Sequence, residues 1–213
     1  MSGEKSRDGG RAYRMDKRAQ DVAATRQEIV EAAVRLHGSL GPAATTVSAV
    51  AQEAGVTRLT VYRHFPDAET LFAACSAHWG SGQTYPDVPA WLEERDPGDR
   101  LRVALADLYR FYAEGEPMLT RIHRDHEALP PTIQERNAAA EVAQREALLA
   151  AFTTVRGAAR RRRLTAVLQH ALSFWTWRSL CLDGGLTQRE AVDAMTALVL
   201  TTAGPTRLTA DDT

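Results

Sequence analysis

The chain has 213 residues, of which 44% are hydrophobic and 25% are charged, and its formal net charge is −1. This length suits one large domain, or a small domain joined to a medium one, with enough apolar residues to bury a core. The sequence contains no apolar run of the roughly 18 residues that a membrane span needs, and its polar N-terminus does not resemble a secretory signal. Cys75 and Cys181 are too few for a disulfide framework. We therefore expect a globular protein of the reducing cytoplasm, with no membrane partner.

The charge is distributed unevenly along the chain. Residues 1–66 hold ten Lys/Arg against seven Asp/Glu, whereas residues 67–213 hold sixteen against twenty. A basic N-terminal part on an acidic remainder is typical of a polyanion-binding head on a separate carrier. Residues 1–20 contain Gly9 and Gly10 and five basic residues between Arg7 and Arg18, which predicts a flexible basic arm.

The next segment predicts a head of three helices over residues 21–66. The first helix runs from about residue 21 to Gly41-Pro42, and its apolar stripe is Ile29, Ala33, Leu36 and Leu40. Thr46 is positioned to cap a second helix that ends at Gly55. Thr57 is positioned to cap a third, short helix that Pro66 ends. The third helix contains two β-branched threonines and two valines in GVTRLTVYRHF, so intrinsic propensity gives it little reason to form.

The remaining residues, 67–213, predict a second all-helical domain. Asp67 is positioned to cap a helix that dissolves at residues 80–89, and Thr187 and Glu190 form a capping box before a last helix that ends at Gly204-Pro205. Further helices are expected over residues 97–112, 116–128, 132–156 and 158–182. The expected fold is therefore all-α, with about nine helices.

The second and third helices, joined at Gly55, form a helix-turn-helix pattern. At 100° per residue, Val61 and Phe65 point together toward the core, while Leu59 and Arg63 lie nearly opposite. Such a helix can enter a major groove, where Arg58 or Arg63 pairs with guanine and Leu59 or Thr60 touches a thymine methyl group. The short-reach donors suited to phosphates are Tyr62, His64 and Thr46, and Thr45 and Thr57 complete the set of expected DNA contacts.

The run from Ala44 to Phe72, ATTVSAVAQEAGVTRLTVYRHFPDAETLF, resembles the DNA-binding head of TetR-family transcriptional regulators. The shared pattern comprises Thr45-Thr46, the turn from Ala51 to Val56, the Tyr-x-His-Phe segment from Tyr62 to Phe65 that ends the third helix, and Leu71-Phe72. Two positions depart from the family: Leu59 stands where glycine is frequent, and Ala68 stands where a phosphate-contacting lysine is common. The basic arm could replace that lysine, or it could be a nonspecific tail.

The resemblance implies a homodimeric, ligand-responsive regulator, more often a repressor than an activator, that binds a palindromic operator in double-stranded DNA. It implies no enzyme activity and no cofactor, and the sequence holds no nucleophile–base–orienter set. A small, mostly apolar effector would occupy the second domain, with candidate contacts Trp79, Tyr109, Tyr112, Met118, Ile122, His126, Phe174 and Trp175. The dimer would form on the last two helices, with candidate residues Leu164, Leu168, Leu172, Met195, Leu198 and Val199.

Two other interpretations stay open on the residues alone. The alternative function is a small-molecule-binding or metal- or thiol-sensing helical protein in which DNA binding is secondary. Cys75 and His78, and also His123 and His126, have the i, i+3 spacing of metal ligands. The favoured interpretation of these four is that they are ordinary surface or pocket residues without a metal. The run Arg160–Arg163 is interpreted as a solvated turn.

Overall fold

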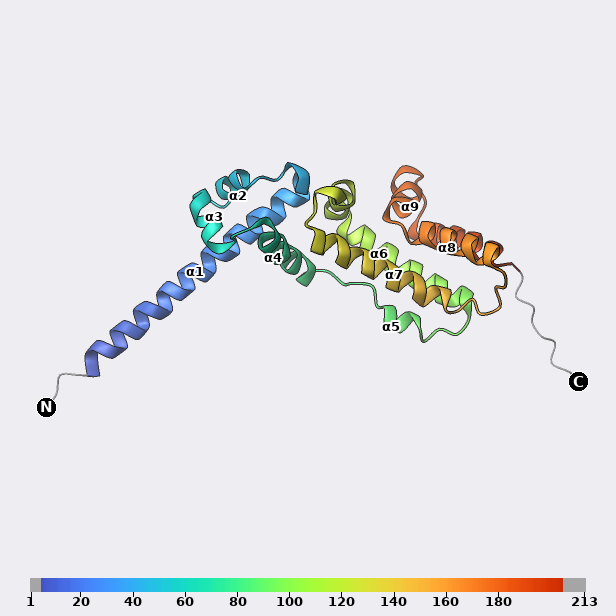
Figure 1. Cartoon of the computed structure of the whole chain (residues 1–213), viewed down its shortest axis with the longest axis horizontal. Coiled ribbons are helices and arrows are strands. Elements are labelled where there is room, and N and C mark those ends of the chain that lie inside the picture. The colour runs from blue at the N-terminus through green and yellow to red at the C-terminus, as the bar shows by residue number, and fades with distance from the viewer. Residues whose placement is uncertain (1–4, 205–213) are drawn as a thin grey trace, which may run out of the picture. The chain divides into compact units, whose positions relative to one another are not determined.

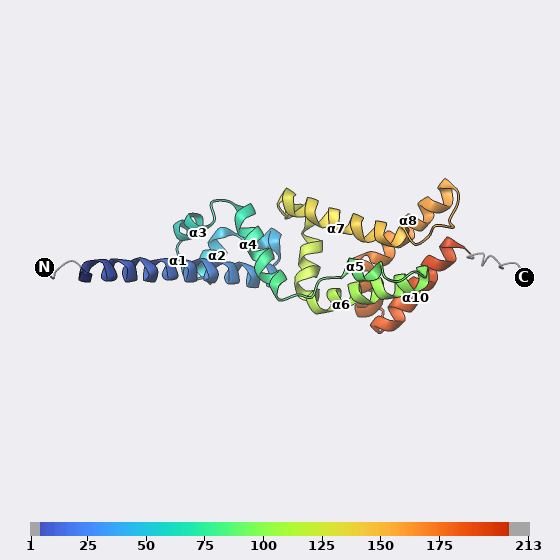
Figure 2. The same cartoon turned by 90° about the horizontal axis from the view of Figure 1, so that it is seen from below.

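The computed structural model describes the backbone of residues 5–204 and the side chains of residues 13 and 15–204. Throughout this range the regular structure is helical, so the all-α prediction is confirmed, with ten α-helices where about nine were expected (Figures 1 and 2). No helix in the range combines the length and apolar character that a membrane span requires. The α-helices are α1 (Lys5–Ser39), α2 (Val47–Glu53), α3 (Arg58–His64), α4 (Ala68–Ser81), α5 (Val88–Trp91), α6 (Pro97–Arg124), α7 (Pro131–Leu149), α8 (Ala158–Leu172), α9 (Phe174–Arg178) and α10 (Gln188–Ala203).

The chain divides into two compact units. We call residues 1–82 and 120–132 the head, and residues 83–119 and 133–213 the body. The predicted boundary at residue 67 differs from this division, because α4 belongs to the head. Its Leu71 and Cys75 share one buried cluster with Ile29 of α1 and Val61 of α3. The end of α6 also falls in the head, so one continuous helix contributes residues to both units.

Four helical boundaries differ from the expectations. The helix expected over 132–156 is α7, which ends at Leu149 and is followed by a turn. The segment predicted as a flexible arm is helical from Lys5, because the residues after Gly10 are mostly strong helix formers such as Arg, Ala, Met, Lys and Gln. The two helices expected over 97–112 and 116–128 are one helix, α6, which continues through Pro117 to the buried Leu119. The helix expected over 158–182 ends at Leu172. There Ser173 accepts a hydrogen bond from the Trp175 N–H (3.2 Å) and starts α9, and a π-helical turn over Ser179–Asp183 follows.

Candidate functional site

The helix-turn-helix is built by local capping. The hydroxyl oxygen of Thr46 accepts a hydrogen bond from the Ala49 N–H at 3.1 Å, and Thr57 does the same for the Thr60 N–H at 3.1 Å. Between the two helices Gly55 has φ 67°, a left-handed conformation that glycine adopts without a Cβ penalty. These predicted features are confirmed, and they set where α3 begins.

One face of α3 is anchored in the head. Val61 is 1% exposed, and Phe65, just after the helix, is 2% exposed. The guanidinium carbon of Arg26 lies 4.2 Å from the centre of the Phe65 ring, a cation–π contact that covers the ring from α1. Burial of these two side chains compensates for the poor helix propensity of the segment.

The other face of α3 is exposed and contains no acidic residue. Leu59 is 71% exposed and Tyr62 is 44% exposed, and both Arg58 and Arg63 lie at the surface. His64 is half-buried, on the side nearer the core. This face therefore offers two guanidinium groups, a phenol and an aliphatic side chain, which is the chemistry that reads base edges and phosphates in DNA.

Four of the predicted contact residues also have structural roles, because Thr46 caps α2 as described above. The Thr57 and Thr60 hydroxyls lie 2.9 Å apart and share a hydrogen bond. The Thr45 hydroxyl donates to the Gly41 carbonyl at 2.8 Å in the turn before α2. A hydroxyl already engaged in a cap or turn is less free to contact a base. The DNA-contacting roles of these threonines, and of the other residues of α3, stay predictions.

Residues at the end of α6 are hydrogen-bonded to the turn that precedes α2, and no sequence pattern predicted these contacts. Arg121 donates to the Ser39 carbonyl at 2.7 Å, and Arg124 donates to the Leu40 carbonyl at 2.8 Å, so both satisfy carbonyls at the end of α1. Asp125 accepts from the Ala43 N–H at 3.1 Å. A side chain at Gly41 (φ 96°) would overlap Arg124 and Asp125. We call Arg121, Arg124 and Asp125 the latch. No local sequence motif predicts these residues, because over eighty residues separate each of them from its partner.

The body contains an aromatic cluster that joins α6 to the break between α8 and α9. Tyr112 lies 5.3 Å from Phe174 and 5.9 Å from Trp177 between ring centres. The Tyr112 hydroxyl donates to the Leu172 carbonyl at 2.7 Å, and the Tyr109 hydroxyl donates to the Ala171 carbonyl at 2.8 Å. Two tyrosines thus satisfy the carbonyls that the end of α8 leaves free, and burial raises the pKa of both.

The predicted effector residues fall in both units. The body holds Tyr109, Tyr112 and Phe174 in the cluster, together with the half-buried Met118 and with Trp175, which is 45% exposed and lies 5.3 Å from Phe174. The head holds the other three, Trp79, Ile122 and His126. The structure therefore brings together part of the predicted set, and the pocket as a whole stays a prediction.

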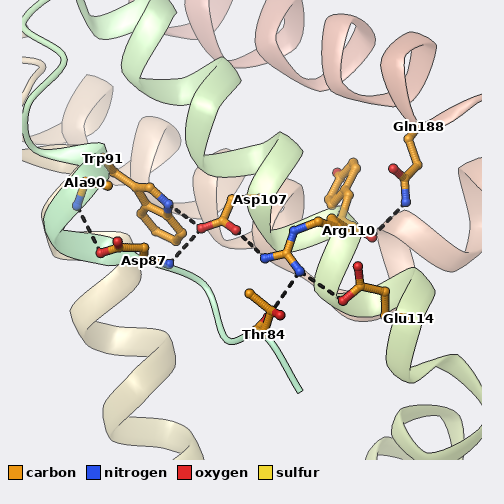
Figure 3. A network of polar contacts seen from close by, with 9 residues as sticks. Thr84, Asp87, Ala90, Trp91, Asp107, Arg110, Glu114 and Gln188 are labelled. Carbon is orange, nitrogen blue, oxygen red and sulfur yellow. Dashed lines mark hydrogen bonds and ion pairs between the residues drawn. The ribbon is translucent and has the colours of Figure 1, made fainter. Parts of the chain in front are cut away.

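Within the body, a polar network joins α6 to the segment that precedes it (Figure 3). One carboxylate oxygen of Asp107 accepts from the indole N–H of Trp91 at 2.9 Å and from the Asp87 N–H at 2.7 Å, while the other oxygen pairs with Arg110 at 2.7 Å. Burial alone would raise the pKa of Asp107, but these donors outweigh it and lower the pKa. The contacts of Asp107 with Asp87 and Trp91 could not be predicted from the sequence, because they join residues 20 and 16 positions apart that no local motif relates.

The predicted dimer residues are mostly part of the core of a single chain. Leu164, Leu168, Leu172 and Val199 are 8% exposed or less, where α8 packs along α10. Leu198 is 41% exposed and Met195 is half-buried. On α10, Leu198 is exposed together with Ala194 and Ala197, and the dimer interface stays a prediction.

The cysteine and histidine pairs do not assemble a metal centre. In the part of the chain that the structure describes, no three His, Cys, Asp or Glu side chains are placed to hold a metal ion. Cys75 is buried, its thiol lies 3.8 Å from the Val30 carbonyl, and burial raises its pKa to about 12. His78 shares a hydrogen bond with Gln27, and burial followed by the charge of His126 lowers the pKa of His123 to about 4. Cys75 therefore belongs to the packing of the head, whereas His78 and His126 lie at its surface.

Comparison with known proteins agrees with this geometry. Residues 29–75 match the family described as bacterial regulatory proteins, tetR family. The chain is 35% identical over 88 residues to the HTH-type transcriptional regulator AcrR of Shigella flexneri, covering 41% of this chain and 40% of that protein. It is 33% identical over 102 residues to the nucleoid occlusion factor SlmA of Vibrio vulnificus, covering 47% and 52%. The chain thus spans about half the length of the curated relatives it matches.

Solved structures extend the likeness to most of the chain. The TetR family transcriptional regulator PfmR of Thermus thermophilus is 25% identical with a TM-score of 0.57, over 81% of this chain and 97% of that one. A TetR-like transcriptional regulator of a Rhodococcus species, at 19% identity and a TM-score of 0.55, covers 83% and 94% and shows the same fold. The matched head, its capped helix-turn-helix and the shared helical architecture lead to one conclusion: residues 29–75 form a TetR-family DNA-binding head, in a chain whose fold is that of TetR-family regulators.

Proposed function

We propose that the protein is a homodimeric, ligand-responsive repressor that binds a palindromic operator in the cytoplasm. The observation that carries this proposal is α3, whose inner face is buried by Val61 and Phe65 while Arg58, Leu59 and Arg63 remain exposed. An exposed basic helix with a fully anchored back is what insertion into a major groove requires.

A dimer follows from the amount of DNA that one α3 can read. A helix of seven residues contacts too few base pairs for useful specificity, so two copies must act on two half-sites. The exposed part of α10 around Leu198 is the surface we assign to the second copy, because Ala194 and Ala197 allow close helix approach. Val199 and Leu168 support that surface from within the chain.

The effector is proposed to be a small, mostly apolar molecule with a hydrogen-bond acceptor. The aromatic cluster of Tyr112, Phe174 and Trp177 supplies apolar contact. The indole N–H of Trp177, a residue 2% exposed, has no partner within the described residues. A buried donor without a partner costs about 1–3 kcal/mol, which an acceptor on the effector would recover.

Coupling between effector and operator is assigned to α6. This helix carries Tyr109 and Tyr112 in the body and ends in the head with the latch, so movement of α6 would displace the turn before α2. An effector that prefers one position of α6 would shift the population between DNA-binding and released states by its differential affinity.

The test is binding of the purified protein to its own promoter region across a salt series. We expect steep salt dependence and a sequence-specific excess over random duplex. Arg63→Ala should relax one base position at a cost of about 1–3 kcal/mol, while Tyr62→Phe and His64→Ala weaken all sequences alike. The matched control is Arg163→Ala, an exposed arginine of the body. Equal affinity for random and promoter DNA would refute the proposal.

A further inference from the structure

The N-terminal part of α1 extends beyond the rest of the head. Residues 5–28 form roughly 36 Å of helix before Ile29, the first buried residue among the described side chains. Both views show this rod projecting past α2, α3 and α4 (Figures 1 and 2). The side chains of residues 15–28 are exposed apart from the half-buried Thr25, and Arg26 and Gln27 contact other parts of the head.

The basic residues of this extension follow the helical period. Arg7, Arg11, Arg14 and Arg18 occupy positions i, i+4, i+7 and i+11 of α1, which place them on one face. At 100° per residue, Asp8 and Asp16 fall about 100° and 180° away from Arg7. Over residues 5–20 the acidic positions therefore lie off the face that carries the arginines, whereas Asp21, about 40° from Arg7, lies on that face just after the last arginine. We call these four arginines the arginine stripe.

The arginine stripe shares its face of α1 with the head's core. The same spacing runs on through Val22 and Thr25 to Ile29, and then to Leu36. Ile29 is fully buried in the cluster that α1 forms with α2, α3 and α4, and Leu36 packs against the same cluster. The stripe positions thus continue the side of α1 on which α3 lies.

Charge separates the extension from the helix-turn-helix. Residues 1–20 hold six basic residues and three acidic ones, whereas residues 21–66 hold four of each. All of the basic excess of residues 1–66 therefore lies before the helix-turn-helix. Residues 21–66 are thus formally neutral, whereas the extension is basic. This distribution is suited to a polyanion that continues beyond the contact made by α3.

Although strong helix formers follow Gly10, the exposed residues 15–24 give the extension no packing that would stabilise it as a helix. Helices without a packed face are marginally stable in water, and Gly9 and Gly10 weaken a helix relative to alanine. Phosphates along the arginine stripe would remove the repulsion between its like charges and stabilise the helix.

We propose that the N-terminal extension of α1 is a second DNA-contacting element, whose arginine stripe binds backbone phosphates of the duplex that flanks the bases read by α3. The inference rests on the proposed function. The contact carries no base readout, so it raises affinity for every sequence and positions the head on the duplex.

The test compares Arg11→Gln/Arg14→Gln with the matched control Lys5→Gln/Lys17→Gln. Both double variants remove two positive charges from the same helix, but the lysines lie off the stripe, and Gln keeps helix propensity. On a duplex that extends past the operator, the stripe variant should bind on the order of ten- to thirty-fold more weakly. The slope of log binding constant against log salt concentration should become shallower by about two. The control should keep the wild-type slope, and trimming the duplex to the operator should remove the difference.

The outcomes separate this inference from the proposed function. Equal losses for both double variants, or no loss for the stripe variant on the long duplex, would overturn the role of the stripe. If the wild type then still prefers its operator and Arg63→Ala still weakens it, the proposed function survives alone. If the wild type shows no preference for promoter DNA, both fail.

Discussion

In the head, α3 turns Arg58, Tyr62 and Arg63 toward solvent, whereas in the body the hydroxyls of Tyr109 and Tyr112 point inward and donate to the carbonyls that end α8. The head is held by an apolar cluster and by short caps, so its outer face contributes little to stability. The body uses polar side chains as internal links between helices. Surface residues can therefore change with little cost in the head, while each inward polar group of the body is tied to its geometry.

The largest expected change in unfolding free energy distinguishes the buried face of the α3 region from its exposed face. Phe65→Ala should lower the free energy of unfolding of the head by about 3–5 kcal/mol, because the ring is 2% exposed and Arg26 covers it. Leu59→Ala, at 71% exposure, should stay within about 0.5 kcal/mol of the wild type. Urea unfolding followed by circular dichroism measures both. Equal losses would show that Leu59 is a structural residue.

A pH series on Asp107→Asn probes the inward polar groups of the body. The hydrogen bonds that lower the pKa of Asp107 stabilise the folded state above the unfolded pKa, about 3.9, and this contribution is lost as pH falls through the folded pKa. The variant should lose about 1–3 kcal/mol of unfolding free energy near neutral pH. The difference from the wild type should shrink below pH about 4. A difference that does not change with pH would contradict this role.

A pair of identical substitutions sharpens the contrast between inward and outward hydroxyls. Tyr112→Phe should cost about 1–2 kcal/mol of unfolding free energy, because it leaves the buried Leu172 carbonyl without its donor. Tyr62→Phe, on the exposed face of α3, should leave stability unchanged and weaken DNA binding. Thermal unfolding and operator binding, measured on both variants, decide between the roles. A loss of stability in Tyr62→Phe together with unchanged stability in Tyr112→Phe would contradict both assignments.

The smallest effect concerns a cap. Thr57→Ala should lower the free energy of unfolding by about 1 kcal/mol, because the Thr60 N–H loses its acceptor. Ser48→Ala, an exposed hydroxyl within α2, serves as the control and should stay within about 0.5 kcal/mol of the wild type. Denaturant midpoints compare the two. A loss at Ser48 as large as the loss at Thr57 would argue against the cap.

Local features of the fold were predictable because a few neighbouring residues decide them. Thr46, Thr57 and Asp67 accept the N–H three residues ahead, and Thr187 with Glu190 completes a capping box, as their spacing predicted. The arm before residue 21 was predicted to be flexible because of Gly9 and Gly10. It is helical from Lys5, because the strong formers that follow extend α1 toward the N-terminus.

The sequence by itself determined the helical composition of the protein, the helix-turn-helix, and the chemistry of the exposed face of α3, because capping and a 3.6-residue period are local properties. Only the tertiary structure decided that α4 and the end of α6 belong to the head, and that Arg121 and Arg124 hold the carbonyls that end α1. It also decided that Leu164 and Leu168 lie in the subunit core. These contacts join residues far apart along the chain, so their geometry depends on how whole helices pack.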